Sequence, residues 1–343
     1  MTVSITGHGF VEFASPEPHA LHDLFRRMGF VAIKKHKRQP ITLYRQGDID
    51  FLVNETPDSF ASSFAAKHGP SACGFAILFD DAEAAKKQAD NNGATPLAPE
   101  KGLDLPVIEG IGGAALYLSD KSGWQGLLHD DFEDIPGVPQ NPTGFGLTFV
   151  DHLTHNVYSG EMEQWADYYT RLFGFEPIRY FDIRGEQTGL LSKAMRSPGD
   201  KVKIPINESS DPKSQINEYL QEYNGPGIQH IALFTDNIYE TVESMRACGM
   251  EFLDTPDTYY SVIDQRIPGH EENVERMRKN RILIDADPET GKKILLQIFT
   301  KNAIGPIFFE IIQRKGNQGF GEGNFKALFE SIELDQKRRG YLT

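Results

Sequence analysis

Three residues of types that bind transition metals recur at almost even intervals along this chain. His152, His230 and Glu310 each fall in an apolar segment that is typical of a buried β-strand. A carboxylate is costly in such a segment unless it is paired or bound to a metal. Two imidazoles and one carboxylate are the ligand set of non-haem Fe(II) oxygenases, which leaves coordination positions open for substrate and O2.

The same residues also have an ordinary structural explanation. The chain has ten histidines, and a single buried histidine is more often a hydrogen-bonded core residue than a ligand. The metal hypothesis therefore depends on the elements that would bring the three side chains together.

Composition limits the classes of protein that this chain can belong to. Its 343 residues, 39% hydrophobic and 24% charged, indicate a globular protein of two domains. A formal net charge of −14 argues against nucleic acid as a partner. The two cysteines, Cys73 and Cys248, are too few for a disulfide framework and favour a reducing compartment. We find no signal-peptide pattern and no apolar run of membrane-spanning length, and we therefore expect a cytoplasmic location without membrane contact.

An internal repeat supplies candidate elements to position the ligands. Residues 69–94 and 225–250 share a pattern of Gly-Pro turn, apolar strand, acidic cap, amphipathic helix and terminal glycine, at a constant offset. The identical positions are Gly69-Pro70, Ala76, Asp80 and Gly93 in the first copy, and Gly225-Pro226, Ala232, Asp236 and Gly249 in the second. The chain is predicted to contain four strand–helix–strands units in two pairs, with a Pro- and Gly-rich linker over 134–144.

The two halves differ where the metal ligands would lie. His230 corresponds to Gly74, and His152 falls near residues 7–10, where His8 is out of register. The first half offers no clear counterpart of Glu310. This asymmetry predicts that one half keeps a metal site and that the other serves as a scaffold.

Several longer motifs resemble one known family. They are VDHLTHNV at 150–157, GIQHIAL at 227–233, LLQIFTK at 295–301, FEIIQR at 309–314 and GNQGFGEGNFKALF at 316–329. Together they resemble 4-hydroxyphenylpyruvate dioxygenase, and the resemblance covers essentially the whole chain. It is dense after residue 150 and loose before it.

The resemblance implies an α+β fold of paired βαβββ modules, the vicinal-oxygen-chelate fold. It implies two domains, a scaffold domain without a metal site at 1–140 and a catalytic domain at 141–343, with a C-terminal lid helix at about 324–336. It also implies that His152, His230 and Glu310 bind Fe(II) as the cofactor.

A substrate pocket is implied by the same resemblance. Its members would be Ser192, Asn207, Gln215, Gln229, Gln297, Phe299, Phe320 and Phe325, with catalytic roles for Gln297, Gln215, Asn207 and Phe325. Gln229 directly precedes His230, and neighbours on a regular strand point to opposite faces. Both can line one pocket only if the strand starts or bulges there, which Gly227 would permit.

The implied reaction converts 4-hydroxyphenylpyruvate and O2 to homogentisate and CO2 in tyrosine and phenylalanine catabolism, in a homodimer or homotetramer. One alternative is 4-hydroxymandelate synthase, which uses the same substrate but hydroxylates the benzylic carbon; the Pro205-Ile206-Asn207 motif and Phe325 favour attack on the ring. A second alternative is a metal-free small-molecule-binding protein on the same fold.

Overall fold

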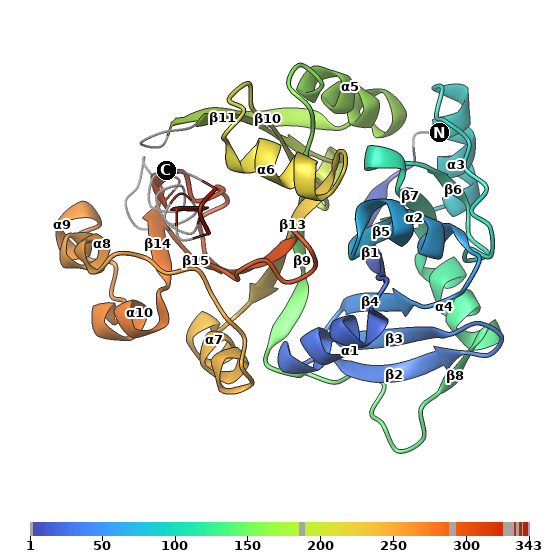
Figure 1. Cartoon of the computed structure of the whole chain (residues 1–343), viewed down its shortest axis with the longest axis horizontal. Coiled ribbons are helices and arrows are strands. Elements are labelled where there is room, and N and C mark those ends of the chain that lie inside the picture. The colour runs from blue at the N-terminus through green and yellow to red at the C-terminus, as the bar shows by residue number, and fades with distance from the viewer. Residues whose placement is uncertain are drawn as a thin grey trace.

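The computed structural model describes residues 3–184, 189–287 and 293–324, together with 333, 336, 337 and 339–341 (Figure 1). Strands in these ranges form two eight-stranded sheets. The first sheet contains β1 (Ile5–Ala14), β2 (Val31–His36), β3 (Ile41–Gln46), β4 (Ile49–Asn54), β5 (Ser71–Phe79), β6 (Val107–Glu109), β7 (Ala115–Asp120) and β8 (Phe132–Asp134). The second contains β9 (Leu147–Asn156), β10 (Glu176–Arg184), β11 (Gly189–Arg196), β12 (Lys203–Glu208), β13 (Gly227–Thr235), β14 (Leu283–Ala286), β15 (Ile294–Phe299) and β16 (Phe308–Lys315).

Helices flank the two sheets (Figure 1). They are α1 (Pro18–Arg27), α2 (Phe60–His68), α3 (Ala82–Asn91), α4 (Lys121–Asp130), α5 (Met162–Phe173), α6 (Gln215–Glu222), α7 (Ile238–Ala247), α8 (Asp257–Ser261), α9 (Ile263–Arg266) and α10 (Val274–Asn280), with short 3-10 turns η1 (Ile111–Gly113), η2 (Pro198–Asp200) and η3 (Glu322–Asn324). In the described ranges, none of them combines the length and the apolar character needed to cross a bilayer.

Seven strands of the two sheets share one topology, which confirms the predicted duplication. The strand orders are β6-β7-β5-β1-β4-β3-β2-β8 and β10-β11-β12-β9-β13-β16-β15-β14. With the second order read in reverse, these seven strands match, and the eighth strand, β8 or β14, lies at opposite edges. In each, a central antiparallel pair, β1–β5 or β9–β13, is flanked by parallel partners. The offset found in the sequence relates β5 to β13 and α3 to α7 residue by residue, including the helix caps Asp81 and Asn237.

Strand register shows what the first sheet carries at the positions of the predicted metal ligands. Those positions hold Phe10, Gly74 and Tyr117. The rings of Phe10 and Tyr117 have centroids 5.3 Å apart, and the Tyr117 hydroxyl donates to the buried carboxylate of Glu12 at 3.1 Å. His8 is out of register, as the sequence indicated. Aromatic packing therefore occupies the place where the second sheet has imidazoles and a carboxylate.

The two halves are joined through a shared hydrophobic core that draws residues from both sheets. Phe75 of β5 packs edge-on against His155 of β9, with ring centroids 5.9 Å apart. Nδ1 of His68 donates a hydrogen bond to the carbonyl of Tyr223 at 2.7 Å. These contacts fix the position of the second sheet relative to the first.

A glycine at this junction gives a test of how tightly the halves fit. Gly112 has φ +61°, and a Cβ there would lie 2.0 Å from the carbonyl oxygen of Pro226. Its neighbour Gly113 has φ +87° and an open surrounding. Both glycines have a positive φ, so alanine strains the backbone at either position. The difference in unfolding free energy between Gly112→Ala and Gly113→Ala therefore measures the clash of the new Cβ with Pro226. We expect Gly112→Ala to lower the free energy of unfolding, measured in urea, by about 1–3 kcal/mol more than Gly113→Ala. Equal losses would contradict the close fit.

Candidate metal centre and pocket

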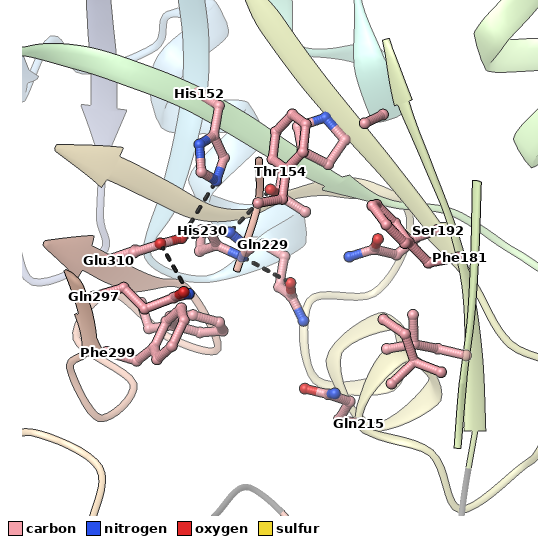
Figure 2. Close-up of a pocket in the computed structure, with 17 residues that line it drawn as sticks. His152, Thr154, Phe181, Ser192, Gln215, Gln229, His230, Gln297, Phe299 and Glu310 are labelled. Carbon is pink, nitrogen blue, oxygen red and sulfur yellow. Dashed lines mark hydrogen bonds and ion pairs between the residues drawn. The ribbon is translucent and has the colours of Figure 1, made fainter. Parts of the chain in front are cut away.

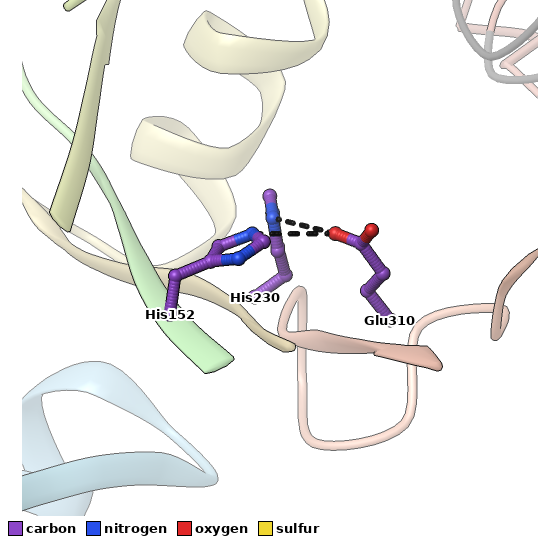
Figure 3. A group of neighbouring side chains, drawn as sticks. All are labelled: His152, His230 and Glu310. Atoms are coloured by element: carbon purple, nitrogen blue, oxygen red, sulfur yellow. Dashed lines mark ion pairs between the residues drawn. The ribbon is translucent and has the colours of Figure 1, made fainter. Parts of the chain in front are cut away.

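His152, His230 and Glu310 converge on one point from three neighbouring strands of the second sheet (Figure 3). Their ligand atoms all lie within 4.8 Å of one another. Oε2 of Glu310 is 3.3 Å from Nε2 of His152 and 3.6 Å from Nε2 of His230. The three residues predicted from the sequence are therefore brought together with their donor atoms facing each other.

Hydrogen bonds fix the tautomers of both imidazoles. Nδ1 of His152 lies 2.9 Å from Oδ1 of Asp151, and Nδ1 of His230 lies 2.9 Å from Oε1 of Gln229. Carboxylate and carbonyl oxygens can only accept, so the proton sits on Nδ1 in each ring. The lone pair is then on Nε2, which faces Glu310 in both rings and in His230 also lies 2.9 Å from the Thr154 hydroxyl, a possible donor. This is how metal-binding histidines are oriented by their neighbours.

Glu310 is the residue whose environment most clearly requires a cation. It is only 3% exposed, and its ion-pair partners in the described part of the chain are His152 and His230. Nε2 of Gln297 donates to Oε1 of Glu310 at 3.3 Å, which leaves Oε2 directed at the imidazoles. A divalent cation held by both Nε2 atoms would compensate this buried carboxylate. The residues therefore fit a metal.

The two imidazoles differ in basicity for identifiable reasons. Burial lowers the pKa of His230 well below its ordinary value, and His152 lowers it further. Burial also lowers the pKa of His152, but the Asp151 and Glu310 carboxylates beside the ring outweigh this and raise it overall. A carboxylate behind a metal-binding imidazole increases its basicity as a ligand.

The three residues form one end of a pocket that encloses about 660 Å³ of space, part of it open to solvent (Figure 2). Its lining includes every predicted site residue that the structure describes, namely His152, Ser192, Asn207, Gln215, Gln229, His230, Gln297, Phe299, Glu310 and Phe320. Phe325 and most of the predicted lid helix at 324–336 lie outside the described residues. Figure 2 shows Ser192 and Gln215 across the pocket from the metal-binding end.

Strand pairing explains how distant residues reach the same wall. Phe181, Ser192 and Asn207 are cross-strand neighbours on β10, β11 and β12, and such neighbours share a face of the sheet. Gln297 and Phe299 are two apart on β15, so they also point the same way. Gln215 comes from the first turn of α6, which Ser214 caps.

Gln229 reaches the pocket through an irregularity in β13. The pairing of β13 with β9 shifts register between Ile228 and His230. This shift lets Gln229 and His230, although adjacent, both line the pocket. The bulge that the sequence required is therefore present.

Sequence reasoning missed several lining residues and one buried ion pair. The missed lining residues are Thr154, Phe181, Ile183, Leu190, Ala194, Pro205 and Phe308. The ion pair joins Asp151 to Arg314 through two contacts of 2.7 Å. Its signal was present in the sequence: an acid directly before one ligand, and a cation on the same strand face as Glu310, four residues later.

The fold and the site define a metal-binding enzyme of a superfamily built on duplicated βαβββ modules. Residues 149–262 match the Glyoxalase/Bleomycin resistance protein/Dioxygenase superfamily, and residues 2–133 match the family described as Hydroxyphenylpyruvate dioxygenase, HPPD, N-terminal. The chain belongs to the 4-hydroxyphenylpyruvate dioxygenase family and is a dioxygenase. The predicted family and its vicinal-oxygen-chelate fold are thereby confirmed.

Individual relatives support this assignment along the full length of the chain. The chain is 53% identical to Hemolysin VllY of Vibrio vulnificus, covering 98% of this chain and 96% of that protein. It is 50% identical to 4-hydroxyphenylpyruvate dioxygenase of Pseudomonas aeruginosa, covering 99% and 97%. A solved mutant of 4-hydroxymandelate synthase from Streptomyces coelicolor superposes with a TM-score of 0.83 at 25% identity, covering 97% and 99%. The lower identity makes the synthase branch the poorer fit.

Proposed function

We propose that this protein is an Fe(II)-dependent 4-hydroxyphenylpyruvate dioxygenase, which converts 4-hydroxyphenylpyruvate and O2 to homogentisate and CO2 in tyrosine and phenylalanine catabolism. The observation that carries the proposal is the convergence of three donor atoms within 4.8 Å at one end of a pocket walled by carboxamides and phenylalanines. When bound, Fe(II) supplies the redox chemistry that activates O2.

His152, His230 and Glu310 would hold the metal. Asp151 keeps the proton of His152 on Nδ1, and Gln229 does the same for His230. In this tautomer each Nε2 presents its lone pair to the metal. The protein thus prepares the donor set before any ligand arrives.

The carboxamide side chains suit a substrate with a 2-oxo acid at one end and a phenol at the other. Gln297 lies beside Glu310 and would orient the oxo-acid end. Ser192, Asn207 and Gln215 lie on the remaining wall and would bind the phenol hydroxyl. Hydroxyl and carboxamide groups can donate or accept, and they remain uncharged while doing so.

Phenylalanine rings would exclude water and confine the substrate ring. Phe320 stands edge-on to His152, with ring centroids 5.6 Å apart, and Phe299 lies 6.5 Å from the ring of His230. By the resemblance, Phe325 would bracket the phenol from the lid helix and direct attack to the ring. That role remains a proposal on residues outside the described ranges.

We also propose how the chain is divided into domains, where it is located and how it assembles. Residues 1–140 would serve as the scaffold domain and 141–343 as the catalytic domain, in keeping with aromatic packing at the first sheet's equivalent of the site. Cys73 and Cys248 are free thiols, which suits a cytoplasmic location. We propose a homotetramer or homodimer, which light scattering of the purified protein would test.

Product analysis tests the proposed reaction. The protein, loaded with Fe(II) under anaerobic conditions, is mixed with 4-hydroxyphenylpyruvate and O2, and the products are separated by chromatography while CO2 is counted. We expect homogentisate and CO2 in equal amounts, and neither from protein kept in a chelator. Hydroxymandelate would instead assign the chain to the synthase branch. Binding of substrate without product, in the metal-loaded protein, would favour a small-molecule-binding protein.

A further inference from the structure

A buried arginine stands two hydrogen bonds away from the proposed metal. Nε and Nη2 of Arg314 each donate to a carboxylate oxygen of Asp151 at 2.7 Å. The Asp151 oxygen that accepts from Nη2 also accepts from Nδ1 of His152. Both side chains of the ion pair are buried, at 6% and 3% exposure. The position of the guanidinium therefore bears directly on the orientation of the His152 ring.

The remaining terminal nitrogen of the same guanidinium holds the Gly-rich segment that follows β16. Nη1 of Arg314 donates to the carbonyl oxygens of Asn317 at 3.2 Å and Gly319 at 2.6 Å. The Asn317 side chain in turn accepts from the amide of Gly319 at 2.7 Å. The next residue is Phe320, whose ring lies against His152 in the pocket wall.

We propose that Arg314 is a positioning residue that couples the orientation of the metal ligand His152 to the conformation of residues 316–321, so that the metal centre and the Phe320 wall are set together. The guanidinium presents its donors in one rigid plane. This plane fixes the Asp151 carboxylate relative to the carbonyls of Asn317 and Gly319. The role in metal binding rests on the proposed function.

Coupling between the bound metal and segment 316–321 must act in both directions. If an ordered 316–321 segment stabilises the bound orientation of His152, a bound metal must stabilise that segment by the same free energy. A disturbance at Asp151 should therefore be felt in the segment, which Asp151 reaches through the hydrogen bonds of Arg314 and through the contact of the His152 ring with Phe320.

The first sheet provides a matched control. Nε and Nη2 of Arg45 donate to the two carboxylate oxygens of Asp50 at 2.6 and 2.7 Å, and Nη1 donates to the carbonyl of Gln140 at 3.3 Å. Asp50 also accepts from the indole of Trp124 at 2.9 Å. This pair has the same construction as that of Arg314, but its carboxylate is bonded to an indole and not to a metal ligand.

The experiment compares Arg314→Lys, Asp151→Asn and Arg45→Lys in the full chain. Fe(II) affinity is measured by anaerobic titration, and amide hydrogen exchange is followed in a peptide that covers residues 316–321. We expect Arg314→Lys and Asp151→Asn each to weaken Fe(II) binding by about 10–100-fold, the range for partners of metal ligands. Both should also accelerate exchange in 316–321, and Fe(II) should slow that exchange in the wild type. Arg45→Lys should change neither quantity.

The outcomes separate this inference from the proposed function. If the wild type turns over substrate but Arg314→Lys binds Fe(II) normally, or Asp151→Asn leaves exchange in 316–321 unchanged, the coupling is wrong and the proposed function stands. If the wild type binds no Fe(II), the proposed function fails and the link between metal and segment fails with it. Asp151→Asn keeps the shape of the side chain, so unchanged exchange in that variant overturns the coupling even if Arg314→Lys does not fold. Loss of affinity in Arg45→Lys equal to that in Arg314→Lys would also overturn it.

Discussion

Glu310→Gln is expected to abolish turnover while leaving the metal-free protein at least as stable as the wild type. The amide keeps the size of the carboxylate but removes the buried negative charge that the three-residue cluster directs at a cation. Without that charge the metal should bind poorly. We expect kcat to fall by about 10³-fold or more, because a bound metal supplies several kcal/mol of transition-state stabilisation. Stability without metal should not fall, because burying an uncompensated charge is costly.

Thermal unfolding with and without Fe(II) measures how much the bound metal stabilises the fold. At a hundredfold excess over Kd, binding should stabilise the wild type by about 2.7 kcal/mol and Glu310→Gln by almost nothing. Glu12→Gln is the control, because Glu12 is an equally buried carboxylate of the first sheet that accepts from Asn54 and Tyr117. That variant should keep the full response to Fe(II). An undiminished response in Glu310→Gln would remove Glu310 from the metal site, and His152→Ala and His230→Ala extend the test to the other two ligands.

The metal ligands could be predicted from sequence because two simple regularities apply to them. Each lies in a strand whose apolar neighbours make a polar residue conspicuous, and the repeat then relates His230 to Gly74 by a fixed offset. The division into repeated strand–helix–strands units followed from the same repeat, since β5 with α3 and β13 with α7 keep one spacing, whereas the vicinal-oxygen-chelate fold was implied by the family resemblance. The counterpart of Glu310 could not be found this way. Helices α8 to α10 and strand β14 are inserted after α7, so Tyr117 and Glu310 no longer share the offset.

The parts of the site that sequence reasoning missed depend on contacts between distant strands. Asp151 and Arg314 are 163 residues apart, so each can be noticed beside a metal ligand in its own segment, but their pairing with one another cannot. Thr154 and Phe308 line the pocket because strand register turns them toward it. A pattern confined to one segment carries no information about such pairings, whereas the positions taken from the family resemblance carry it indirectly.

Gly321→Ala is expected to lower kcat/KM by about 100-fold, the effect of misplacing a reacting group by about 1 Å. A Cβ at Gly321 would lie 1.8 Å from Oε1 of Gln297 and 2.9 Å from its Nε2. Gln297 has no room to retreat, because it is 1% exposed and is held by Glu310 on one side and by Asn324 at 3.2 Å on the other. The added methyl group must therefore displace either the carboxamide or the segment that follows β16.

The control for this prediction is another glycine of the same segment. Gly316 has φ +86° and Gly321 has φ +77°, so alanine strains the backbone at both positions, by about 1–3 kcal/mol. At Gly316, however, the three atoms nearest to the new Cβ belong to the side chain of Lys293, with Cγ closest at 3.2 Å, and a small shift of that side chain relieves the contact. Gly316→Ala should therefore lose a similar free energy of unfolding in urea and keep most of its activity. If both variants lose activity equally, backbone strain in the segment is the cause, and the role given to Gln297 beside Glu310 is wrong. If only Gly321→Ala loses activity, with a weaker affinity for Fe(II), the carboxamide of Gln297 is what holds Glu310 in place.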